Sequence, residues 1–417
     1  MGQKPAPAGA RLSRVDDGDG QQQRVEVGRL CTVRDVDWSA RTALVRVDFN
    51  VPMKDGRVAD DTRIRAALPT LQHLREHGAR VVLLSHLGRP NGKPNPKYSL
   101  EPVAERLGEL LKMPCPFAAD CIGPPAEAAV KMIGSGEVVL LENVRFHPEE
   151  EANDPGFAAQ LAKLGDVFVN DAFGTAHRAH ASTEGLAHYL PAVAGLLMEK
   201  EIVTIGQALE SPKRPFVAIV GGAKVSSKLA VLQNLIDRVD RLLIGGGMAN
   251  TFLKAQGREV GKSLLEPDLV TTARELVSRA EKVVLPVDVV VTTDLKGEAP
   301  GRTVAVTEVA ADDIIVDIGP RAIEAFRAEI TRAGTVLWNG PMGVFENPRF
   351  AGGTLAVAQA MAESKAVTIV GGGESVQAVE QADLADKLTH VSTGGGASLE
   401  FIEGKVLPGV AALKHDC

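Results

Sequence analysis

Short apolar runs alternate with amphipathic segments of about 10 to 15 residues from residue 42 onward. This alternation is typical of βαβ units, so we expect an α/β fold with parallel sheets. Near-continuous hydrophobicity within the runs indicates strands that are buried on both faces. The predicted strands are ALVRV (43–47), RVVLLS (80–85), EVVLLEN (137–143), DVFVN (166–170), FVAIV (216–220), RLLIG (241–245), TVLWN (335–339) and AVTIV (366–370).

The segments between these strands predict helices that face a core. In RIRAALPTLQHLREHG, residues 63–78, apolar residues recur at helical spacing, and Gly78 suits the position after a helix end. Residues 99–113, SLEPVAERLGELLKM, show the same spacing behind Ser99, which we expect to cap the helix.

Two halves of the chain differ in the residues that follow their strands. In the first half these residues are polar and basic, as in RVDFNVP, SHLGRPNGKP, ENVRFHPEEE and NDAFGTAHRAH. In the second half they are rich in glycine, as in VGGAKVSSK, IGGGMANTF, WNGPMGVFE, VGGGESV and STGGGASLE. Ligands of open α/β sheets bind at the carboxyl ends of the strands. We therefore expect one basic site and one site rich in backbone amides.

The stretch HYLPAVAGLLMEKEIVTIGQALESPKRP separates the two halves and has an apolar, helical pattern. We interpret it as a connector between two Rossmann-like domains, residues 29–195 and 196–400, with the boundary near residues 190–200. A chain of 417 residues is long enough for two such domains. A single domain with an internal helix is the alternative.

Composition excludes several classes of protein. The net charge of −7 argues against a nucleic-acid partner, and no apolar run of about 18 residues could span a membrane. Four cysteines form no CxxC pair and no closely spaced framework, so neither a zinc ribbon nor a disulfide scaffold is indicated. A reducing cytoplasm fits this pattern. Residues 1–28 lack the apolar core of a secretory signal, and their Pro, Gly, Gln and Asp content predicts a disordered extension.

The glycine turns of the second half match no nucleotide-binding fingerprint completely. GGGMAN, GGGESV and GGGASL carry Asn250, Val376 and Leu399 where a dinucleotide motif requires its third glycine. GREVGKS has only three residues between Gly257 and Gly261, where a P-loop needs four. Five glycine turns at strand ends nevertheless exceed what tight loops alone require, and such turns favour anion binding by backbone amides.

Two lysines follow the first of these turns. Lys224 and Lys228 are spaced to share one face in the first turns of a helix. A cation at that end opposes the helix dipole, so we expect an anionic ligand to offset it. A pair of solvated lysines is the alternative.

A carboxylate also lies at a glycine turn, because Glu374 and Ser375 begin the helix predicted after VGGG. Phosphate would repel this carboxylate unless a cation lay between them, and Mg²⁺ binds through one or two carboxylates plus substrate phosphates. Glu374 is therefore the predicted ligand of a nucleotide-bound Mg²⁺, with Ser375 facing the phosphates through its hydroxyl or backbone N–H. An acidic residue that only stabilises the helix dipole is the alternative.

The first half carries cations just beyond its strand ends. Arg63 falls in the first turn of a helix capped by Asp61 or Thr62, where a lone arginine would be interpreted as a surface residue. It has many basic companions, and guanidinium groups suit carboxylate and phosphate oxygens. The sequence therefore predicts a site for a small multi-anionic molecule. The companions are Arg89, Arg145, Arg178, His86, His147, His177 and His180.

The ordered motifs RVDFNVP, SHLGRP, ENVRFH, NDAFGTAHRAH, GGAKVSSK, IGGGMANTFL, WNGPMGVFE, VGGGESV and HVSTGGGASLEFIEGKVLPGV resemble those of the phosphoglycerate kinase family. The resemblance spans residues 44 to 410. It implies a two-lobed, hinge-bending enzyme that transfers a phosphoryl group between ATP and the carboxylate of 3-phosphoglycerate, giving ADP and 1,3-bisphosphoglycerate in glycolysis and gluconeogenesis. The final segment, residues 401–417, would return to the first domain. We expect a monomer.

The resemblance also implies residue roles. Asp48, Asn50, Arg63, His86, Leu87, Gly88, Arg89, Arg145 and Arg178 would bind 3-phosphoglycerate. Lys224, Lys228, Gly319, Asn339, Glu346, Gly372, Gly373, Glu374 and Ser375 would bind the nucleotide, and Arg63, Lys224 and Gly372 would act in catalysis. The family usually carries Asp at the position of Glu374, so that the expected Mg²⁺ ligand here is one methylene longer.

Two rival functions remain open from the sequence. A nicotinamide oxidoreductase would need a ribose-binding acid, and the broken fingerprints argue against it. A nucleotide-binding protein without catalysis would follow if Glu374 spoiled the metal site.

Overall fold

The computed structural model describes residues 12–13, 26–27, 30–278, 281–296, 301–413 and 417. Most of the predicted disordered extension, residues 1–28, lies outside the described residues. Within it, β1 (Leu12–Ser13) and β2 (Glu26–Val27) pair antiparallel, which composition did not predict.

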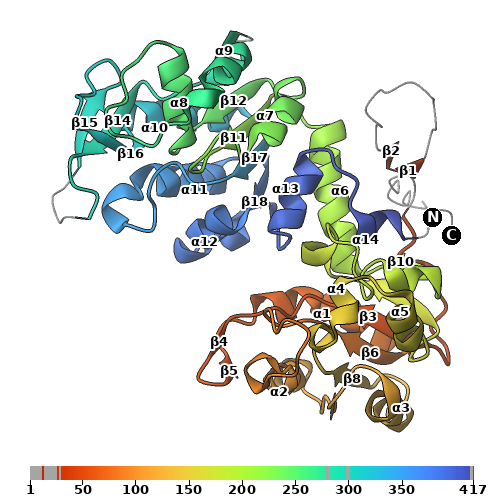
Figure 1. Cartoon of the computed structure of the whole chain (residues 1–417). Coiled ribbons are helices and arrows are strands. Elements are labelled where there is room, and N and C mark those ends of the chain that lie inside the picture. The colour runs from red at the N-terminus through yellow and green to blue at the C-terminus, as the bar shows by residue number, and fades with distance from the viewer. Residues whose placement is uncertain (1–11, 14–25, 28–29, 279–280, 297–300, 414–416) are drawn as a thin grey trace. The chain divides into compact units, whose positions relative to one another are not determined.

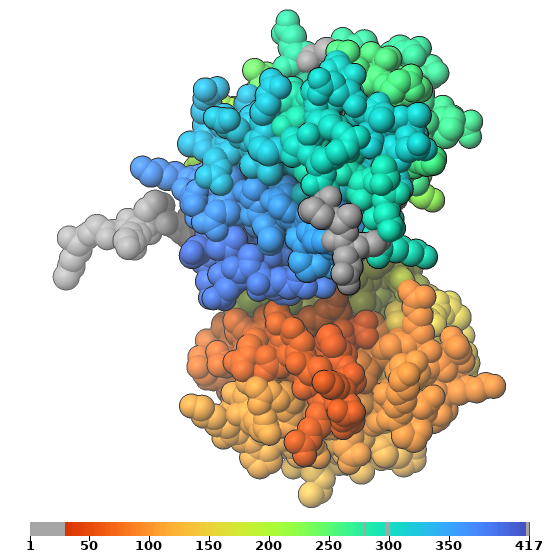
Figure 2. Space-filling model, turned by 90° about the vertical axis from the view of Figure 1, so that its left-hand side faces the viewer, coloured from red at the N-terminus to blue at the C-terminus, as the bar shows by residue number. Residues whose placement is uncertain are grey.

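The chain forms two units, one of Met1–Val203 with Val406–Cys417 and one of Thr204–Lys405. In the space-filling view, most residues of the first unit are coloured orange to yellow and most residues of the second are coloured green to blue (Figure 2). The expected domains, 29–195 with 401–417 and 196–400, differ from these units at both junctions. The difference arises because helix α6 (Leu196–Glu210), the predicted connector, continues across the first junction.

The first unit contains a six-stranded sheet in the order β10-β9-β3-β6-β8-β7 (Figure 1). All of its strand pairs are parallel, with Leu44 opposite both Val82 and Phe168. The strands are β3 (Thr42–Arg46), β6 (Arg80–Leu84), β7 (Phe117–Ala118), β8 (Val138–Leu141), β9 (Val167–Asn170) and β10 (Ala192–Ala194). A hairpin of β4 (Met53–Lys54) and β5 (Arg57–Val58) precedes the first helix.

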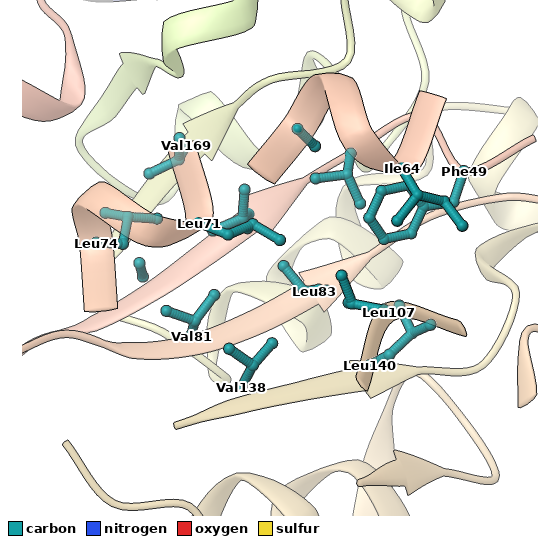
Figure 3. Packing of buried hydrophobic residues seen from close by; sticks show 14 of the residues in the cluster. Phe49, Ile64, Leu71, Leu74, Val81, Leu83, Leu107, Val138, Leu140 and Val169 are labelled. Carbon is teal, nitrogen blue, oxygen red and sulfur yellow. The ribbon is translucent and has the colours of Figure 1, made fainter. Parts of the chain in front are cut away.

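Helices of the first unit cover this sheet. Their bounds are α1 (Thr62–Glu76), α2 (Glu101–Leu111), α3 (Gly123–Met132), α4 (Pro148–Glu151), α5 (Pro155–Ala162) and α14 (Pro408–Ala411). Helix α1 places Ile64, Leu71 and Leu74 against strand residues such as Val81 and Leu83 (Figure 3). The helix ends as predicted, because Gly78 follows the C-cap with φ of 82°. Leu100 is the N-cap of α2, although Ser99 Oγ still accepts a bond from the Glu101 N–H (3.3 Å).

The second unit contains another six-stranded parallel sheet, in the order β13-β12-β11-β17-β18-β19. Its strands are β11 (Phe216–Val220), β12 (Arg241–Ile244), β13 (Val283–Val284), β17 (Thr335–Asn339), β18 (Val367–Gly371) and β19 (His390–Val391). Its helices are α7 (Leu229–Ile236), α8 (Met248–Ala255), α9 (Val270–Ser278), α10 (Pro320–Arg332), α11 (Gly352–Glu363), α12 (Gly373–Gln381) and α13 (Gly396–Ile402). All eight strands predicted from apolar runs are confirmed, as are the two parallel sheets.

A three-stranded antiparallel sheet of the second unit was not predicted. Its order is β15-β14-β16, and Figure 1 shows it beside α10. The strands are β14 (Asp288–Thr292), β15 (Arg302–Ala305) and β16 (Ile314–Ile318). Strand β15 is half exposed and carries no apolar run, so the pattern that identifies buried parallel strands does not detect it.

A disulfide joins Cys31 to Cys417 within the first unit. The sequence did not indicate it, because a separation of 386 residues gives no recognisable spacing. Cys115 and Cys121 are free thiols. Among the described residues, no helix is both long enough and apolar enough to cross a membrane.

Candidate functional site

The first-turn arginine of α1 lies against the end of β3. Asp61 is the N-cap and α1 begins at Thr62, so Arg63 falls in the first turn, as predicted. Arg63 Nη1 donates to Asp48 Oδ2 (3.2 Å) and to the Asn50 carbonyl (3.1 Å). The Asp48 carboxylate thus offsets a cation that the helix dipole disfavours. The Arg63 side chain remains 36% exposed and can reach a ligand.

A tight turn after β6 ties Asn50 to Arg145. The Gly88 N–H donates to Asn50 Oδ1 (2.8 Å), and the Gly88 carbonyl accepts from Arg145 Nη1 (3.0 Å). Gly88 has φ of 61°, and a Cβ there would lie 2.4 Å from the Tyr98 ring. Only glycine therefore fits this turn. Arg89 follows on the exposed surface.

Arg145 is a buried cation close to a second cation. Its side chain is only 5% exposed, and its Nε lies 3.5 Å from Glu151 Oε1. Burial lowers the pKa of Arg145, Glu151 opposes this effect, and the charge of Arg178 lowers the pKa further. Arg178 is half buried, and its Nε donates to His177 Nε2 (3.2 Å). A polyanion bound here would relieve the repulsion between the two guanidinium groups.

His86 and Leu87 lie deeper than a ligand-contacting role suggests. His86 is 3% exposed, and Arg46 Nη2 donates to its Nδ1 (3.1 Å). Burial and the neighbouring charge of Arg46 hold the pKa of His86 well below its ordinary value, so this imidazole is neutral. Leu87 belongs to the hydrophobic core, which leaves its backbone as the part able to face a ligand.

A buried polar chain behind the basic residues was missed by the sequence analysis. Arg46 Nε donates to Ser182 Oγ (2.7 Å), and Ser182 Oγ donates to Glu150 Oε1 (2.5 Å). Glu150 Oε1 lies 3.9 Å from His180 Nδ1. Burial raises the pKa of Glu150, and the charge of Arg46 opposes that rise. The sequence held one signal for this chain of contacts, because Arg46 lies within an apolar strand run. A buried charge requires a partner, so a buried acceptor could have been expected.

In the second unit, helix α12 presents an uncapped N-terminus. Gly372 is the N-cap with φ of 87°, and the described residues provide no side-chain cap for the first turn. A Cβ at Gly373 would meet no atom within 4 Å, so the turn is open. Glu374 is exposed beside it. Ser375 Oγ accepts from the Gly340 N–H (2.6 Å), which leaves the Ser375 backbone N–H to face a ligand.

Lys228 and Asn339 lie beneath this turn. Lys228 Nζ donates to Asn339 Oδ1. The buried Asn339 Nδ2 has no hydrogen-bond partner among the described residues, and it would lie 2.9 Å from a Cβ at Gly372. Burial lowers the pKa of Lys228, while the charges of Glu374 and Glu403 oppose that fall. The orphaned amide donor and the cation are both suited to an anionic ligand.

Lys224 is placed differently from the prediction. Helix α7 begins at Leu229 with Lys228 as its N-cap, so Lys224 lies in the preceding loop. The expectation that both lysines occupy the first turns of a helix is wrong, because the two serines between them form turns instead. Lys224 is exposed. Burial alone would raise the pKa of Glu266, but hydrogen bonds from Ser226 and the charge of Lys224 outweigh it, so that the pKa of Glu266 is lowered.

Packing explains several glycines that the sequence analysis attributed to anion binding. A Cβ at Gly340 would lie 2.2 Å from the Gly221 carbonyl oxygen. A Cβ at Gly246 would lie 2.7 Å from Gly222 N. The N–H groups of Gly222 and Gly246 donate to the carbonyls of Pro341 (3.0 Å) and Met342 (2.9 Å). These glycines permit close approach of β11, β12 and β17.

Gly319 and Glu346 are brought to one edge of the second unit. Gly319 is the N-cap of α10, and a Cβ there would lie 2.4 Å from the Asp288 carboxyl carbon. The loop that carries Glu346 is held on β16 by a bond from the Val344 N–H to the Val316 carbonyl (2.8 Å). Glu346 itself is exposed.

Two other features of the first unit lie apart from the predicted residues. Asp120, Cys121 and His147 form the group of metal-capable side chains found among the described residues, and Glu374 belongs to no such group there. Burial holds the pKa of the Cys121 thiol well above its usual range. A groove of about 730 Å³ is lined by residues from Arg57 to Glu109, and several of its charged groups pair with one another, as Arg106 does with Asp61 (2.7 Å).

Comparison with known proteins identifies the family. The model of the family described as phosphoglycerate kinase matches residues 33–405. The phosphoglycerate kinase of Chloroflexus aurantiacus is 63% identical over 397 residues, covering 92% of this chain and 98% of that protein. The phosphoglycerate kinase of Moorella thermoacetica is 59% identical over 386 residues, with the same coverage.

Solved structures give the same result. The structure of phosphoglycerate kinase from Coxiella burnetii is similar with a TM-score of 0.84 and 43% identity, covering 92% of this chain and 98% of that chain. The phosphoglycerate kinase structure from Pyrococcus horikoshii is similar with a TM-score of 0.81, 37% identity and the same coverage. This chain therefore belongs to the phosphoglycerate kinase family.

Proposed function

We propose that this protein catalyses reversible phosphoryl transfer between ATP and the carboxylate of 3-phospho-D-glycerate, giving ADP and 1,3-bisphosphoglycerate. The observation that carries the proposal is the pairing of Arg63 with Asp48 and Asn50 at a basic strand edge, in a chain of this family. A second edge, at the open turn before α12, supplies the amides and cation that a nucleotide requires.

The first unit binds the acid substrate in this proposal. Arg63 contacts the substrate carboxylate and the group in transfer, with Asp48 and Asn50 orienting the glycerate. Arg145 and Arg178 neutralise the 3-phosphate, because two nearby guanidinium groups match its charge and geometry. The His86–Arg89 stretch completes the pocket, with Arg89 and the backbone of Leu87 and Gly88 as the contacting groups.

The second unit binds the nucleotide. Lys224 and Lys228 meet the phosphates together with the backbone N–H groups of Gly372, Gly373 and Ser375. Asn339, Gly319 and Glu346 form the nucleoside side of the pocket, with the Asn339 Nδ2 as an available donor.

The donor set suits Mg²⁺ that arrives with the nucleotide. Glu374 is an exposed carboxylate at this turn, and Mg²⁺ is bound through one or two carboxylates plus phosphate oxygens. The remaining ligands of the ion would be phosphate and water oxygens. When bound, Mg²⁺ neutralises charge that develops on the phosphates.

The reaction needs no general base. A carboxylate has a pKa of about 3.5 and is already an ionised nucleophile at pH 7. The protein then contributes alignment of the attacking oxygen, the phosphorus and the leaving oxygen, together with electrostatic stabilisation of the transferring group. Arg63, Lys224 and the Gly372 amide supply that stabilisation in a direct in-line transfer.

Transfer between sites on two units requires them to face each other across a closed cleft. We infer a hinge motion at the α6 connector on a timescale of about μs to ms. Small-angle scattering is expected to show compaction when MgATP and 3-phosphoglycerate are both present. An unchanged scattering profile with saturating ligands would contradict closure.

The decisive test is a coupled assay with MgATP and 3-phosphoglycerate, which should report formation of 1,3-bisphosphoglycerate. Binding of MgATP without turnover would favour a non-catalytic nucleotide-binding protein instead. Quenching or enhancement of NADH fluorescence at micromolar protein would favour an oxidoreductase.

The cellular setting is part of the same proposal. The enzyme acts in glycolysis and gluconeogenesis as a cytoplasmic monomer, with its small-molecule substrates as partners and with neither nucleic acid nor membrane. Sedimentation equilibrium should return the mass of one chain, and a larger mass would contradict the monomer.

A further inference from the structure

The C-terminal segment of the chain, Val406–Cys417, returns to the first unit and packs there. Leu407, Val410 and Leu413 are 2%, 5% and 3% exposed. The Gly409 carbonyl accepts from Asn170 Nδ2 (3.1 Å), and the Gly409 N–H donates to the Ala176 carbonyl (2.9 Å). The segment therefore supports the end of β9 and the loop that leads to Arg178.

The two cysteines of the disulfide lie at opposite ends of the chain and differ in accessibility. Cys31 is 2% exposed, and its carbonyl accepts from the Ala194 N–H (2.8 Å), which fixes it beside β10. Cys417 is exposed. Their Cα atoms are 5.6 Å apart, within the range that a disulfide spans without backbone movement.

We propose that Cys31 and Cys417 form a reversible redox clasp that pins the returning C-terminal segment to the first unit. The exposed Cys417 sulfur is the one that reacts with the external disulfide on oxidation and with the external thiol on reduction. This cross-link closes nearly the whole chain into a loop, so that it restricts the unfolded state strongly.

The chemistry is thiol–disulfide exchange. On oxidation, the Cys417 thiolate attacks a small disulfide such as oxidised glutathione and expels one thiolate. The Cys31 sulfur, after losing its proton, attacks Cys417 and expels the second thiolate, so two protein thiols become one disulfide and the oxidant becomes two thiols. A dithiol reductant reverses both steps. Most cytosolic disulfides are reduced, so the clasp is open in a reducing cytoplasm and closes under oxidative conditions.

The other two cysteines are poor competitors for this chemistry. Burial raises the pKa of Cys115 to about 12, and burial also holds the pKa of Cys121 well above its usual range. Thiolate is the reactive form, so both remain thiols. They serve as internal controls.

The test uses the full chain after treatment with oxidised glutathione or with dithiothreitol. We expect two reactive thiols in denaturant after oxidation and four after reduction, with the Cys31–Cys417 peptide pair detected by mass spectrometry. The melting temperature of the oxidised form should be about 5 °C or more above that of the reduced form. Four thiols after oxidation, or equal melting temperatures, would overturn the clasp.

Two variants separate the clasp from general effects of the reagents. Cys417→Ser changes an exposed residue and leaves the core intact, so it should melt like the reduced protein under both treatments. Cys115→Ser should keep the full redox-dependent difference. A redox-dependent melting temperature that survives Cys417→Ser would contradict the assignment.

Hydrogen exchange locates the effect. The apolar contacts of Leu407, Val410 and Leu413 remain after reduction, so the segment loosens without detaching. Exchange of amides in residues 406–413 should therefore accelerate on reduction and in Cys417→Ser. Unchanged exchange there would contradict loosening of the segment.

A catalytic consequence rests on the proposed function. Because Gly409 holds Ala176 near Arg178, reduction should raise the KM for 3-phosphoglycerate about threefold and leave the KM for MgATP unchanged. An unchanged KM with a redox-dependent melting temperature would overturn this coupling while the clasp stands. Absence of activity in every form would instead contradict the proposed function.

Discussion

The two units differ in the groups that form their proposed anion-binding edges. The first unit uses side chains. Carboxylates lie beside Arg63 and Arg145, and Arg178 donates to the neighbouring His177 ring. The second uses backbone, with the open turn at Gly372 and one half-buried lysine, Lys228. Side-chain sites need a buried supporting network, whereas a backbone site needs only a turn that keeps its amides unpaired.

Several other helix starts differ from that of α12 in having a carboxylate at their first N–H groups. Carboxylates from strand ends or their flanks accept bonds at the start of α2, α6, α10 and α11. The acceptors are Glu142, Asp171, Asp288 and Asp317. In the described part of the chain, no side-chain cap is found for α12, nor for α13, whose N-cap Gly395 also has a positive φ. An anion can occupy a helix N-terminus only where the protein does not already supply one.

The largest expected effect tests the side-chain edge. Arg63→Ala should lower kcat by about 10³-fold, the scale of arginines that stabilise phosphoryl transfer, with the fold preserved. Steady-state kinetics and circular dichroism provide the measurements. Arg65→Ala is the matched control, since that exposed residue of the same helix pairs only with Asp61 in the described structure. Equal kinetics of the two variants would remove Arg63 from the site.

The next effect tests the backbone edge. Lys228→Ala should lower kcat/KM for MgATP by about 10²-fold, because it removes the half-buried cation that we propose contacts the phosphates. The KM for 3-phosphoglycerate should stay within about twofold if the two edges are independent. Lys262→Ala, which removes an exposed lysine paired with Asp312, should have no effect on either constant. A large rise in the KM for 3-phosphoglycerate would show that the two edges are not independent.

A smaller effect concerns the carboxylate beside the open turn. Glu374→Gln should raise the Mg²⁺ concentration for half-maximal activity about tenfold, while Glu374→Asp should keep or lower it. Magnesium titration at fixed ATP measures both. Identical titration curves for Glu374→Gln and the parent protein would leave this carboxylate with only its effect on the helix dipole.

The smallest effect concerns the pH dependence of stability and the Asp171 side chain at the start of α6. Burial raises the pKa of Asp171 to about 7, so the folded state holds its proton more tightly than the unfolded state. Its contribution to stability is therefore full below pH of about 4 and is lost as the pH rises towards 7. Asp171→Asn keeps an oxygen that can accept from the first N–H groups of α6. The variant should lose less stability than the parent protein as the pH rises, a difference of about a few degrees in melting temperature per pH unit.

Thermal melts between pH 5 and 7 compare Asp171→Asn with the parent protein. His180 works in the opposite sense, because burial and nearby arginines lower its pKa to about 4, so stability from this group is lost as the pH falls. Asp154→Asn, at the exposed start of α5, provides a control. Parallel slopes for Asp171→Asn and the parent would contradict a protonated Asp171.

Sequence patterns predicted the parallel sheets and the first-turn position of Arg63, because buried strands and helix starts have local signals. Sequence patterns failed where a residue is explained by a contact with a residue far away in the chain. Arg46 finds its partner at Ser182, and Gly340 is required by Gly221, contacts that no local spacing reveals. The residue roles came from family resemblance and stay predictions, and the structure adds the hydrogen bonds that hold side chains such as Arg63 and Asn50.

The return of residues 406–417 to the first unit has a consequence for biosynthesis. Chains emerge from the ribosome N-terminus first, and domains generally fold as they become complete. The first unit can complete its fold only after residues near Gly409 have been synthesised, since Asn170 donates to the Gly409 carbonyl. The second unit is continuous from Thr204 to Lys405 and is complete earlier. Translation order and completion order are therefore reversed in this chain.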